Sequence, residues 1–443
     1  MHIHPCTTRR TFLAGMAQAA LLGLSGCGGS DAAPFQLEAH TTVSAQRLDE
    51  AVDAAFPLFN AASVLPGFDA ATHGGRNDVA LYRLRTTARI PETGETFEAT
   101  GLLALPAGAM GSLPVVSWQH GTILSFDQVP SNLTRLADPG YALSDDADSL
   151  ETLFNIHRFA ANGYAVIAAD YVGKGPLRDG RSEGYAVKGV TTATCQAMLQ
   201  AGLAALRSLG VAPGALCLHG WSQGSLNTQW LHQALRGSGV AIAATAVASP
   251  FCDIPEAWAY WAGHKSFPLP AGVSSYPEVP GWVSLCMIIA LGSYEAYYAI
   301  TGLLEDAVRP EFRQMARQYW SDYVFDLERM QPFPTAQTLL VPDFFEPGTA
   351  QGNRLFLEHA RSNGTTGWRY DSPIRFYVGL ADEATHPDMT APVIAANPGF
   401  AQGVLVANAS HRATFLSGLY GSPEMLQGQS NALAWFDAAV GKA

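Results

Sequence analysis

The sequence predicts an α/β fold in which a mostly parallel sheet is covered by helices on both faces. A β-rich hairpin is expected first, over residues 79–90 and 96–105, and short apolar runs then alternate with segments of helical spacing. Alternating strands and helices are typical of a parallel sheet whose strands are buried on both faces. The 43 glycines and 27 prolines of the 443-residue chain also favour many tight turns over a bundle of long helices.

Each expected element has its own local signal. The hairpin turns around Glu92-Thr93-Gly94, and the longest helix, residues 190–209, is rich in alanine and leucine and is closed by Gly210. Further strands are expected at 114–119, 164–169, 215–219, 241–248, 374–378 and 404–407, and further helices at 149–161, 224–235, 389–396 and 431–440. Residues 79–250 and 372–443 are therefore expected to form the two parts of one α/β core.

The alternation is interrupted between residues 251 and 371, and this segment is rich in aromatic residues. Within it, residues 287–304 and 309–330 have helical spacing. Aromatic side chains usually fill cores, and a lid needs a small core of its own. We therefore expect residues 251–371 to form a helical cap inserted before the strand that carries the candidate acid described below.

The N-terminus is expected to be an export signal. Residues 8–13 read Thr-Arg-Arg-Thr-Phe-Leu, and paired arginines before a short apolar stretch are typical of twin-arginine signals. The apolar stretch 14–24 is too short to span a membrane comfortably. Leu24-Ser25-Gly26-Cys27 resembles a bacterial lipoprotein box, in which Cys27 is acylated. We expect residues 1–26 to be the signal, residues 27–78 a tether and N-terminal extension, and the product an envelope lipoprotein or a secreted protein.

Composition and charge narrow the range of partners. The 26 basic and 38 acidic residues give a net charge of −12, and no run is rich in lysine or arginine, so nucleic acid is not an expected partner. The sequence has no metal-ligand spacing and no phosphate-binding loop, so no metal or cofactor is predicted. The membrane is expected to be reached only through a lipid on Cys27.

Four of the six cysteines fall in the expected globular part. Cys217 lies in an apolar run, which is typical of a buried thiol. Export to an oxidising compartment permits a Cys252–Cys286 bridge. The twin-arginine route carries folded proteins, so free thiols are the alternative.

The candidate nucleophile is Ser222, in His219-Gly220-Trp221-Ser222-Gln223-Gly224. This Gly-x-Ser-x-Gly pattern stands where an expected strand ends and a helix begins. A nucleophilic serine on such a sharp turn needs glycine on either side, because a side chain there would collide with the neighbouring strand and helix.

The developing oxyanion needs hydrogen-bond donors near Ser222. The backbone N–H of Gln223 is one candidate, at the start of the helix. The other is expected in Trp118-Gln119-His120-Gly121-Thr122, directly after a strand. The Thr122 N–H is preferred there, and Gly121 is the alternative.

The base and the acid are expected on loops after late strands. His411 follows the strand at 404–407, and Asp382 follows the strand at 374–378. A carboxylate at Asp382 would hold the imidazole in the tautomer that accepts the serine proton. Glu383 is a near alternative for the acid, and Asp253 is another.

These residues resemble the α/β-hydrolase superfamily, whose serine, acid and histidine occur in this order along the chain. The resemblance covers about residues 79–440. The Asp170-Tyr171-x-Gly173-x-Gly175 turn and the long insertion before the acid are similar to secreted lipases related to Candida antarctica lipase A and to bacterial exported esterases. The oxyanion loop departs from the glycine-rich form of some lipases.

The resemblance implies a serine hydrolase that cleaves small-molecule or lipid carboxylic esters through an acyl-enzyme. A serine peptidase or an acyltransferase of the same fold is the alternative, and a non-catalytic, lipid-anchored binding protein is a third hypothesis.

Overall fold

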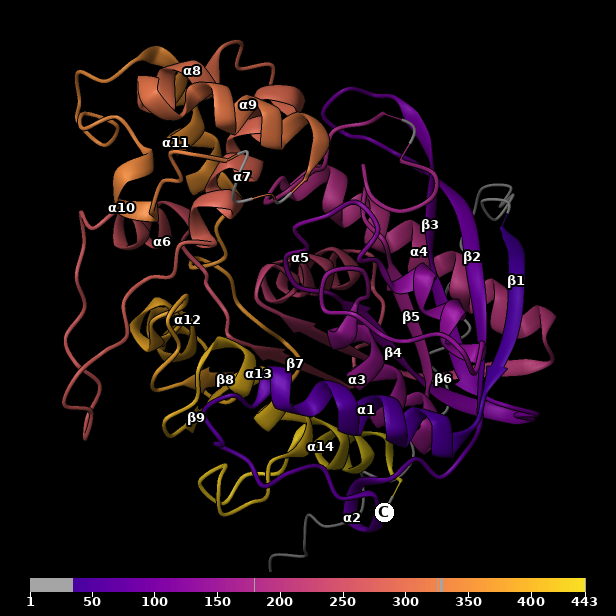
Figure 1. The fold of residues 1–443 in the computed structure, drawn as a ribbon. Coiled ribbons are helices and arrows are strands. Elements are labelled where there is room, and N and C mark those ends of the chain that lie inside the picture. The colour runs from indigo at the N-terminus through magenta and orange to yellow at the C-terminus, as the bar shows by residue number, and fades with distance from the viewer. Residues whose placement is uncertain (1–34, 179, 325, 327–329, 443) are drawn as a thin grey trace, which may run out of the picture. The chain divides into compact units, whose positions relative to one another are not determined.

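A computed structural model describes residues 35–178, 180–324, 326 and 330–442 (Figure 1). Its strands form one nine-stranded sheet in the order β1-β2-β3-β5-β4-β6-β7-β8-β9. The strands are β1 (Gln36–Val43), β2 (Val79–Arg89), β3 (Thr96–Pro106), β4 (Gly111–Gln119), β5 (Ala165–Ala169), β6 (Val211–Trp221), β7 (Ala244–Ala248), β8 (Ile374–Gly379) and β9 (Ala401–Val406). The pairs from β1 to β5 are antiparallel, and β5, β4, β6, β7, β8 and β9 run parallel. The predicted mostly parallel sheet is confirmed.

The helices cover both faces of this sheet, as the sequence predicts. Helices α4 (Lys188–Ser208) and α5 (Gln223–Gly237) contribute to one buried cluster, and α1 (Ala45–Phe59), α3 (Leu150–Arg158), α13 (His411–Tyr420) and α14 (Ala432–Val440) contribute to another. Helices α2 (Ala70–His73) and α12 (Ala391–Ala396) and short 3-10 helices at Pro130–Ala137, Ala160–Asn162, Pro310–Phe312 and Pro387–Met389 complete the connections.

Strand side chains divide between the two clusters in strict alternation. In β5, Ala165 and Ile167 belong to the cluster with α4 and α5, whereas Val166 and Ala168 belong to the cluster with α1 and α3. Successive side chains of a strand point to opposite faces, so a strand buried on both faces must be apolar at every position. This is why the central strands read as unbroken apolar runs.

Residues before the expected hairpin also join the sheet. Strand β1 pairs antiparallel with β2, from Gln36 opposite Arg85 to Val43 opposite Val79. Helix α1 follows it directly, with the Ser44 side chain accepting a hydrogen bond from the Arg47 N–H. The extension expected over residues 27–78 therefore contains regular structure from Gln36 onward.

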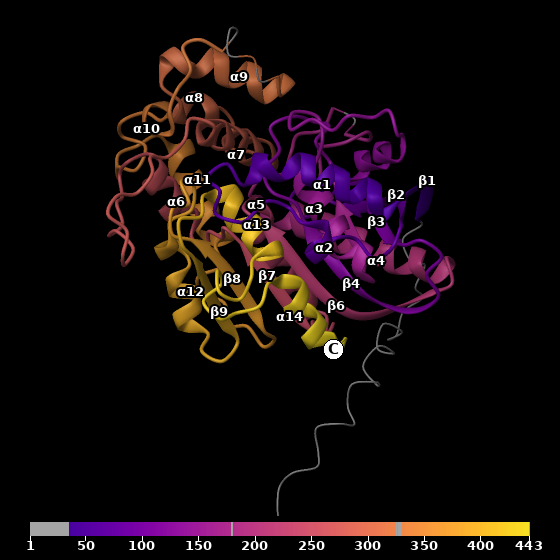
Figure 2. The same ribbon diagram turned by 60° about the horizontal axis from the view of Figure 1, so that its bottom comes forward.

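The segment between β7 and β8 is helical, and its helices group together in both views (Figures 1 and 2). It contains α6 (Ile254–Trp261), α7 (Val283–Tyr297), α8 (Leu303–Ala307), α9 (Arg313–Asp322), α10 (Ala336–Leu339) and α11 (Gln351–Asn363). The expected helices at 287–304 and 309–330 are too long. Ala299 has φ 53° after α7, and Tyr323 has φ 53° after α9. A left-handed residue cannot continue a right-handed helix.

The four cysteines that the structure describes, Cys195, Cys217, Cys252 and Cys286, are buried free thiols. The Cys252–Cys286 bridge that the sequence permits is therefore not formed. The expected export signal and Cys27 lie outside the described residues. Within residues 35–442, as far as they are described, no helix has the length and apolar character needed to cross a membrane.

Candidate active site

Ser222 occupies a sharp turn between β6 and α5. Its backbone has φ 55° and ψ −122°, a conformation that is strained for any residue with a side chain. The two flanking glycines permit this turn. A Cβ at Gly220 would lie 2.1 Å from the Thr228 hydroxyl oxygen, and a Cβ at Gly224 would lie 2.0 Å from the Gln119 carbonyl oxygen. The close approach that the sequence predicts at both glycines is confirmed.

Substituting Gly224 by alanine is expected to destabilise the protein by about 1–3 kcal/mol or more, because the backbone of β4 must move to accept the methyl group. The free energy of unfolding, measured in urea, checks this. Gly237→Ala at the other end of α5 is the matched control, because a Cβ added there would have no neighbouring atom within 4 Å. A loss no greater at Gly224 than at Gly237 would contradict the close packing of the turn.

Ser222, His411 and Asp382 lie in one hydrogen-bonded chain. The Ser222 Oγ is 2.8 Å from His411 Nε2, and His411 Nδ1 is 2.9 Å and 3.1 Å from the two carboxylate oxygens of Asp382. The three residues are 8%, 4% and 0% exposed. The fold thus brings together the three residues that the sequence selects as nucleophile, base and acid.

Neighbouring groups fix the orientation of the acid and the base. Asp382 accepts hydrogen bonds from the backbone N–H groups of Ala384 and Thr385 and from the Thr385 hydroxyl. The carbonyl of His411 accepts hydrogen bonds from Trp221 Nε1 and from the Ser249 hydroxyl. With its carboxylate oxygens also bonded to the imidazole, Asp382 has little freedom to turn away from His411.

The electrostatics of this pair favour a charged acid beside a base that accepts a proton readily. Burial opposes ionisation of Asp382, but the charge of His411 and the hydrogen bonds from His411 and Thr385 leave the pKa of Asp382 below its ordinary value. Burial likewise opposes protonation of His411, but the charge and hydrogen bond of Asp382 leave the pKa of His411 above its ordinary value.

The alternative acids contact other groups. Glu383 accepts a hydrogen bond from the backbone N–H of His411, at 2.9 Å, and so caps the start of α13. Asp253 accepts from the Glu256 N–H and caps α6. Of the three candidate carboxylates, Asp382 is the one bonded to the imidazole.

Burial favours the neutral form of two other histidines near Ser222. Burial lowers the pKa of His120 to about 4 and that of His219 to about 3. His120 stacks on the ring of Tyr171 with centroids 4.0 Å apart, and His219 bonds to Asn155 at 2.7 Å. Both side chains are thus occupied in packing and hydrogen bonding within the core.

One of the residues expected to hold the oxyanion lines a small cavity at Ser222. Thr122 lines this cavity together with Ser222 and His411. Gly121 packs against Trp221, whose ring would lie 2.8 Å from a Cβ at that position. Gln223 directly follows Ser222 as the first residue of α5. The use of the Thr122, Gly121 or Gln223 N–H groups as donors stays a prediction.

The turn Asp170-Tyr171-x-Gly173-x-Gly175 supports the loop beside the cavity. Asp170 accepts hydrogen bonds from the Thr100 hydroxyl at 2.6 Å and the Ser131 N–H at 2.9 Å. The Tyr171 hydroxyl donates to the His120 carbonyl at 3.0 Å. Since Thr122 lies two residues beyond His120, this turn fixes the loop that carries the candidate donors.

Sequence reasoning did not find most of the cavity wall. The additional lining residues include Tyr185, Phe251, Trp261, Trp282, Cys286 and Thr385. The enrichment of residues 251–371 in aromatic side chains is a sequence signal for Trp261 and Trp282, but no local pattern marks Tyr185 or Cys286. Among the described residues, no group of three or more histidine, cysteine or acidic side chains is placed to hold a metal ion.

Comparisons with solved structures identify the fold. No protein-family model matches the chain, and no curated protein sequence is significantly similar to it. A protein of Legionella pneumophila assigned as a hydrolase matches with TM-score 0.69 at 16% identity, over 91% of this chain and 98% of that one. The rice cell wall degrading esterase LipA from Xanthomonas oryzae matches with TM-score 0.64 at 16% identity, over 86% and 95%.

Candida antarctica lipase A in its closed state matches with TM-score 0.56 at 11% identity, over 92% of this chain and 88% of that one. These matches cover 86–92% of this chain. Together with the parallel strand order and the serine turn between β6 and α5, they show that this chain has the α/β-hydrolase fold.

Proposed function

We propose that this chain is a serine hydrolase that cleaves carboxylic esters through an acyl-enzyme. The observation that carries the proposal is the buried hydrogen-bonded chain from Ser222 through His411 to Asp382, which opens on a cavity. Support also comes from two structures of similar fold, which are an esterase and a lipase.

The reaction follows from the positions of these groups. The Ser222 Oγ attacks the ester carbonyl carbon while His411 Nε2 takes the serine proton. Asp382 stabilises the imidazolium, and the N–H groups of Gln223 and of Thr122, or alternatively Gly121, hold the oxyanion. The tetrahedral intermediate collapses and expels the alcohol, which takes the proton from His411. Water, deprotonated by His411, then attacks the acyl-enzyme. The second tetrahedral intermediate expels the Ser222 oxygen, which takes the proton back from His411, and the acid is released.

Export and lipid attachment are further parts of the proposal. The paired Arg9 and Arg10 and the Leu-Ser-Gly sequence before Cys27 support a twin-arginine signal over residues 1–26 and acylation of Cys27. The lipid would tether the hydrolase to the cell envelope. No cofactor or metal enters the proposed reaction.

A peptidase of the same fold receives less support. Recognition of a peptide amine needs carboxylates free to receive it, and Glu305-Asp306 is the adjacent acidic pair that the sequence offers in the cap. Glu305 forms an ion pair with Arg317, which also binds Glu295. Glu305 is therefore already paired with a guanidinium group, which it shares with Glu295.

The test is labelling by a fluorophosphonate, which reacts only with a serine activated by its base. The purified chain is expected to be labelled at Ser222, as located by mass spectrometry of its peptides, and to hydrolyse p-nitrophenyl acetate. Ser222→Ala is expected to show neither. Ser225→Ala is the matched control, because Ser225 lies one helical turn away and its hydroxyl donates to the Ser222 carbonyl. Labelling that persists in Ser222→Ala would exclude Ser222 as the nucleophile.

A further inference from the structure

The cavity at Ser222 is very small. The centre of a water molecule can move within only about 10 Å³ of it, which is room for about one water molecule. Of its lining residues, Thr122 and Trp282 are half-buried and the others are buried. An ester must therefore enter between Thr122 and Trp282, and the rest of the wall limits what can lie deeper.

The two sides of this cavity have different chemical roles. In the proposed reaction the leaving oxygen must lie near His411 Nε2, because it receives its proton from there. Trp282 lies over His411, with ring centroids 5.7 Å apart, and is half-buried at the entrance. The alcohol part of the ester is accordingly assigned to the side of Trp282 and solvent. The acyl part must occupy the side away from His411.

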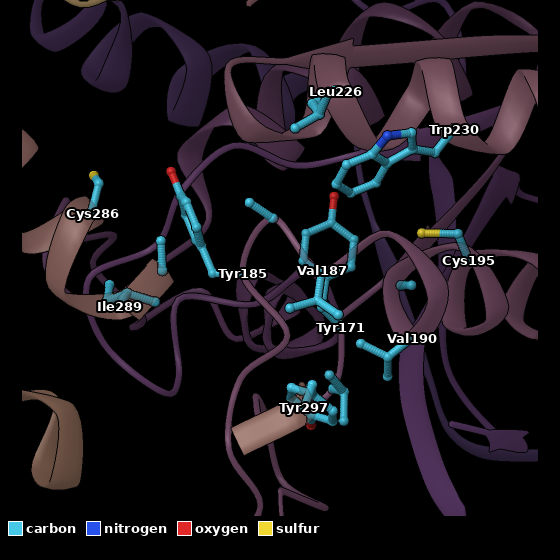
Figure 3. Packing of buried hydrophobic residues seen from close by; sticks show 14 of the residues in the cluster. Tyr171, Tyr185, Val187, Val190, Cys195, Leu226, Trp230, Cys286, Ile289 and Tyr297 are labelled. Carbon is cyan, nitrogen blue, oxygen red and sulfur yellow. The ribbon is translucent and has the colours of Figure 1, made fainter. Parts of the chain in front are cut away.

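Tyr185 and Cys286 belong to the cavity wall, and Tyr185 contacts Thr122, across the site from Trp282. The Tyr185 hydroxyl lies 2.9 Å from the Thr122 hydroxyl oxygen, and the backbone N–H of Tyr185 donates to the Ser293 hydroxyl of α7 at 3.0 Å. Figure 3 shows Tyr185 beside Cys286 and Ile289, with its hydroxyl end towards Cys286. Tyr185 is therefore held by a loop on one side and by α7 on the other, within the buried core.

A longer acyl chain that extends past Thr122 would have to displace this tyrosine. Trp282 is half-buried at the entrance, but Tyr185 is 5% exposed and packed within the core. Moving a side chain out of a close-packed core costs the contacts that it makes there. The wall on the acyl side is thus the less adaptable of the two.

We propose that Tyr185 closes the acyl pocket and limits the hydrolase to short acyl groups, of acetyl to propionyl size, rather than fatty acyl chains. This inference rests on the ester hydrolysis proposed above. It makes Tyr185 a specificity-determining residue, and it assigns the aromatic entrance around Trp282 to the alcohol part of the substrate.

The experiment compares kcat/KM for p-nitrophenyl acetate and octanoate. The unaltered protein is expected to prefer acetate by at least about 100-fold, since several methylene groups find no space. Tyr185→Ala is expected to lower this preference by at least about tenfold, because removal of the tyrosine ring leaves room towards Ile289 for a longer acyl chain. Tyr185→Phe keeps the ring and is expected to retain the preference for acetate over octanoate. Ile289→Ala removes volume behind Tyr185 and is expected to retain the ranking as well.

The outcomes separate this inference from the proposed function. A preference of the unaltered protein for octanoate, with or without detergent, would overturn the assignment of Tyr185, and so would an unchanged ratio in a folded Tyr185→Ala that still reacts with a fluorophosphonate. Should Tyr185→Ala not fold, Tyr185→Leu makes the same comparison with less volume removed. In that case a preference of the unaltered protein for octanoate would still overturn the assignment of Tyr185. Absence of both labelling and hydrolysis of every ester would instead count against the proposed function.

Discussion

Replacing Asp382 with asparagine is expected to lower kcat for p-nitrophenyl acetate by about 10⁴-fold. The amide has nearly the same shape, so the fold is retained. An amide group can donate its N–H to His411 Nδ1, which leaves the proton of the neutral imidazole on Nε2. A protonated Nε2 cannot accept the proton of Ser222. The amide also brings no charge to stabilise the imidazolium that forms when the proton is taken.

Glu383→Gln is the matched control for this loss. Glu383 is the next residue in the chain and also touches His411, but it accepts its hydrogen bond from the backbone N–H at the start of α13. A glutamine oxygen can accept the same bond, so we expect kcat to change by less than about tenfold. A greater loss in Glu383→Gln than in Asp382→Asn would assign the acid to Glu383.

The pH profile gives a second, independent readout of the same pair. Only neutral His411 can accept a proton, so kcat/KM must rise with pH through the pKa of His411 in the free enzyme. Asp382 holds this pKa above the ordinary value of 6.5. The acidic limb of the pH profile is the range in which kcat/KM rises with pH. We therefore expect its midpoint above pH 6.5 in the unaltered protein, and at lower pH for the residual activity of Asp382→Asn. A limb that does not move would show that Asp382 does not act on the base.

The parts of the site that the sequence predicted are those whose requirements are local. The serine turn needs a strand, two glycines and a helix within a few residues, and all of these are readable around Ser222. Asp382 and His411 stand directly after strands whose order in a parallel sheet follows from the alternation of elements. Because the carboxyl ends of parallel strands lie at one edge of the sheet, strand order alone brings these loops together.

The features that the sequence did not predict depend on distant partners. Strand β1 has a mixed sequence, Gln-Leu-Glu-Ala-His-Thr-Thr-Val, because it is an edge strand that pairs only with β2. Left-handed Ala299 and Tyr323 follow the ends of α7 and α9, and they are not residue types that usually mark a helix end. Tyr185 belongs to the cavity wall because Thr122 and Ser293, far from it in the chain, hold it there.

A buried ion pair stabilises the loop that leads to Tyr185. Lys174 Nζ lies 2.9 Å from a carboxylate oxygen of Glu183 and donates to the Ser125 carbonyl at 3.1 Å. The ring of Tyr323, directly after α9, lies 3.7 Å from the ammonium group, and its hydroxyl donates to the same Glu183 oxygen at 2.9 Å. Lys174 and Glu183 are each 2% exposed. Three segments, including one from the stretch between β7 and β8, therefore meet at this pair of charges.

Lys174→Ala is expected to lower the free energy of unfolding by about 3–5 kcal/mol, because it leaves the Glu183 carboxylate buried without its cation. Urea denaturation measures the loss. Removing both charges in Lys174→Met with Glu183→Gln is expected to cost less than Lys174→Ala alone, since no uncompensated charge remains in the core.

Lys265→Ala is the matched control for these variants, because the Lys265–Glu256 ion pair is partly exposed and such pairs contribute about 0–1 kcal/mol. If Lys174→Ala loses no more than Lys265→Ala, water must reach Glu183 and the pair is not a buried one. If the double variant loses more than Lys174→Ala, the two charges stabilise the fold as a pair, and the cost of Lys174→Ala cannot be ascribed to an isolated carboxylate. We expect Lys174→Ala to be the least stable of the three variants. This order distinguishes a desolvated charge from an ordinary lost contact.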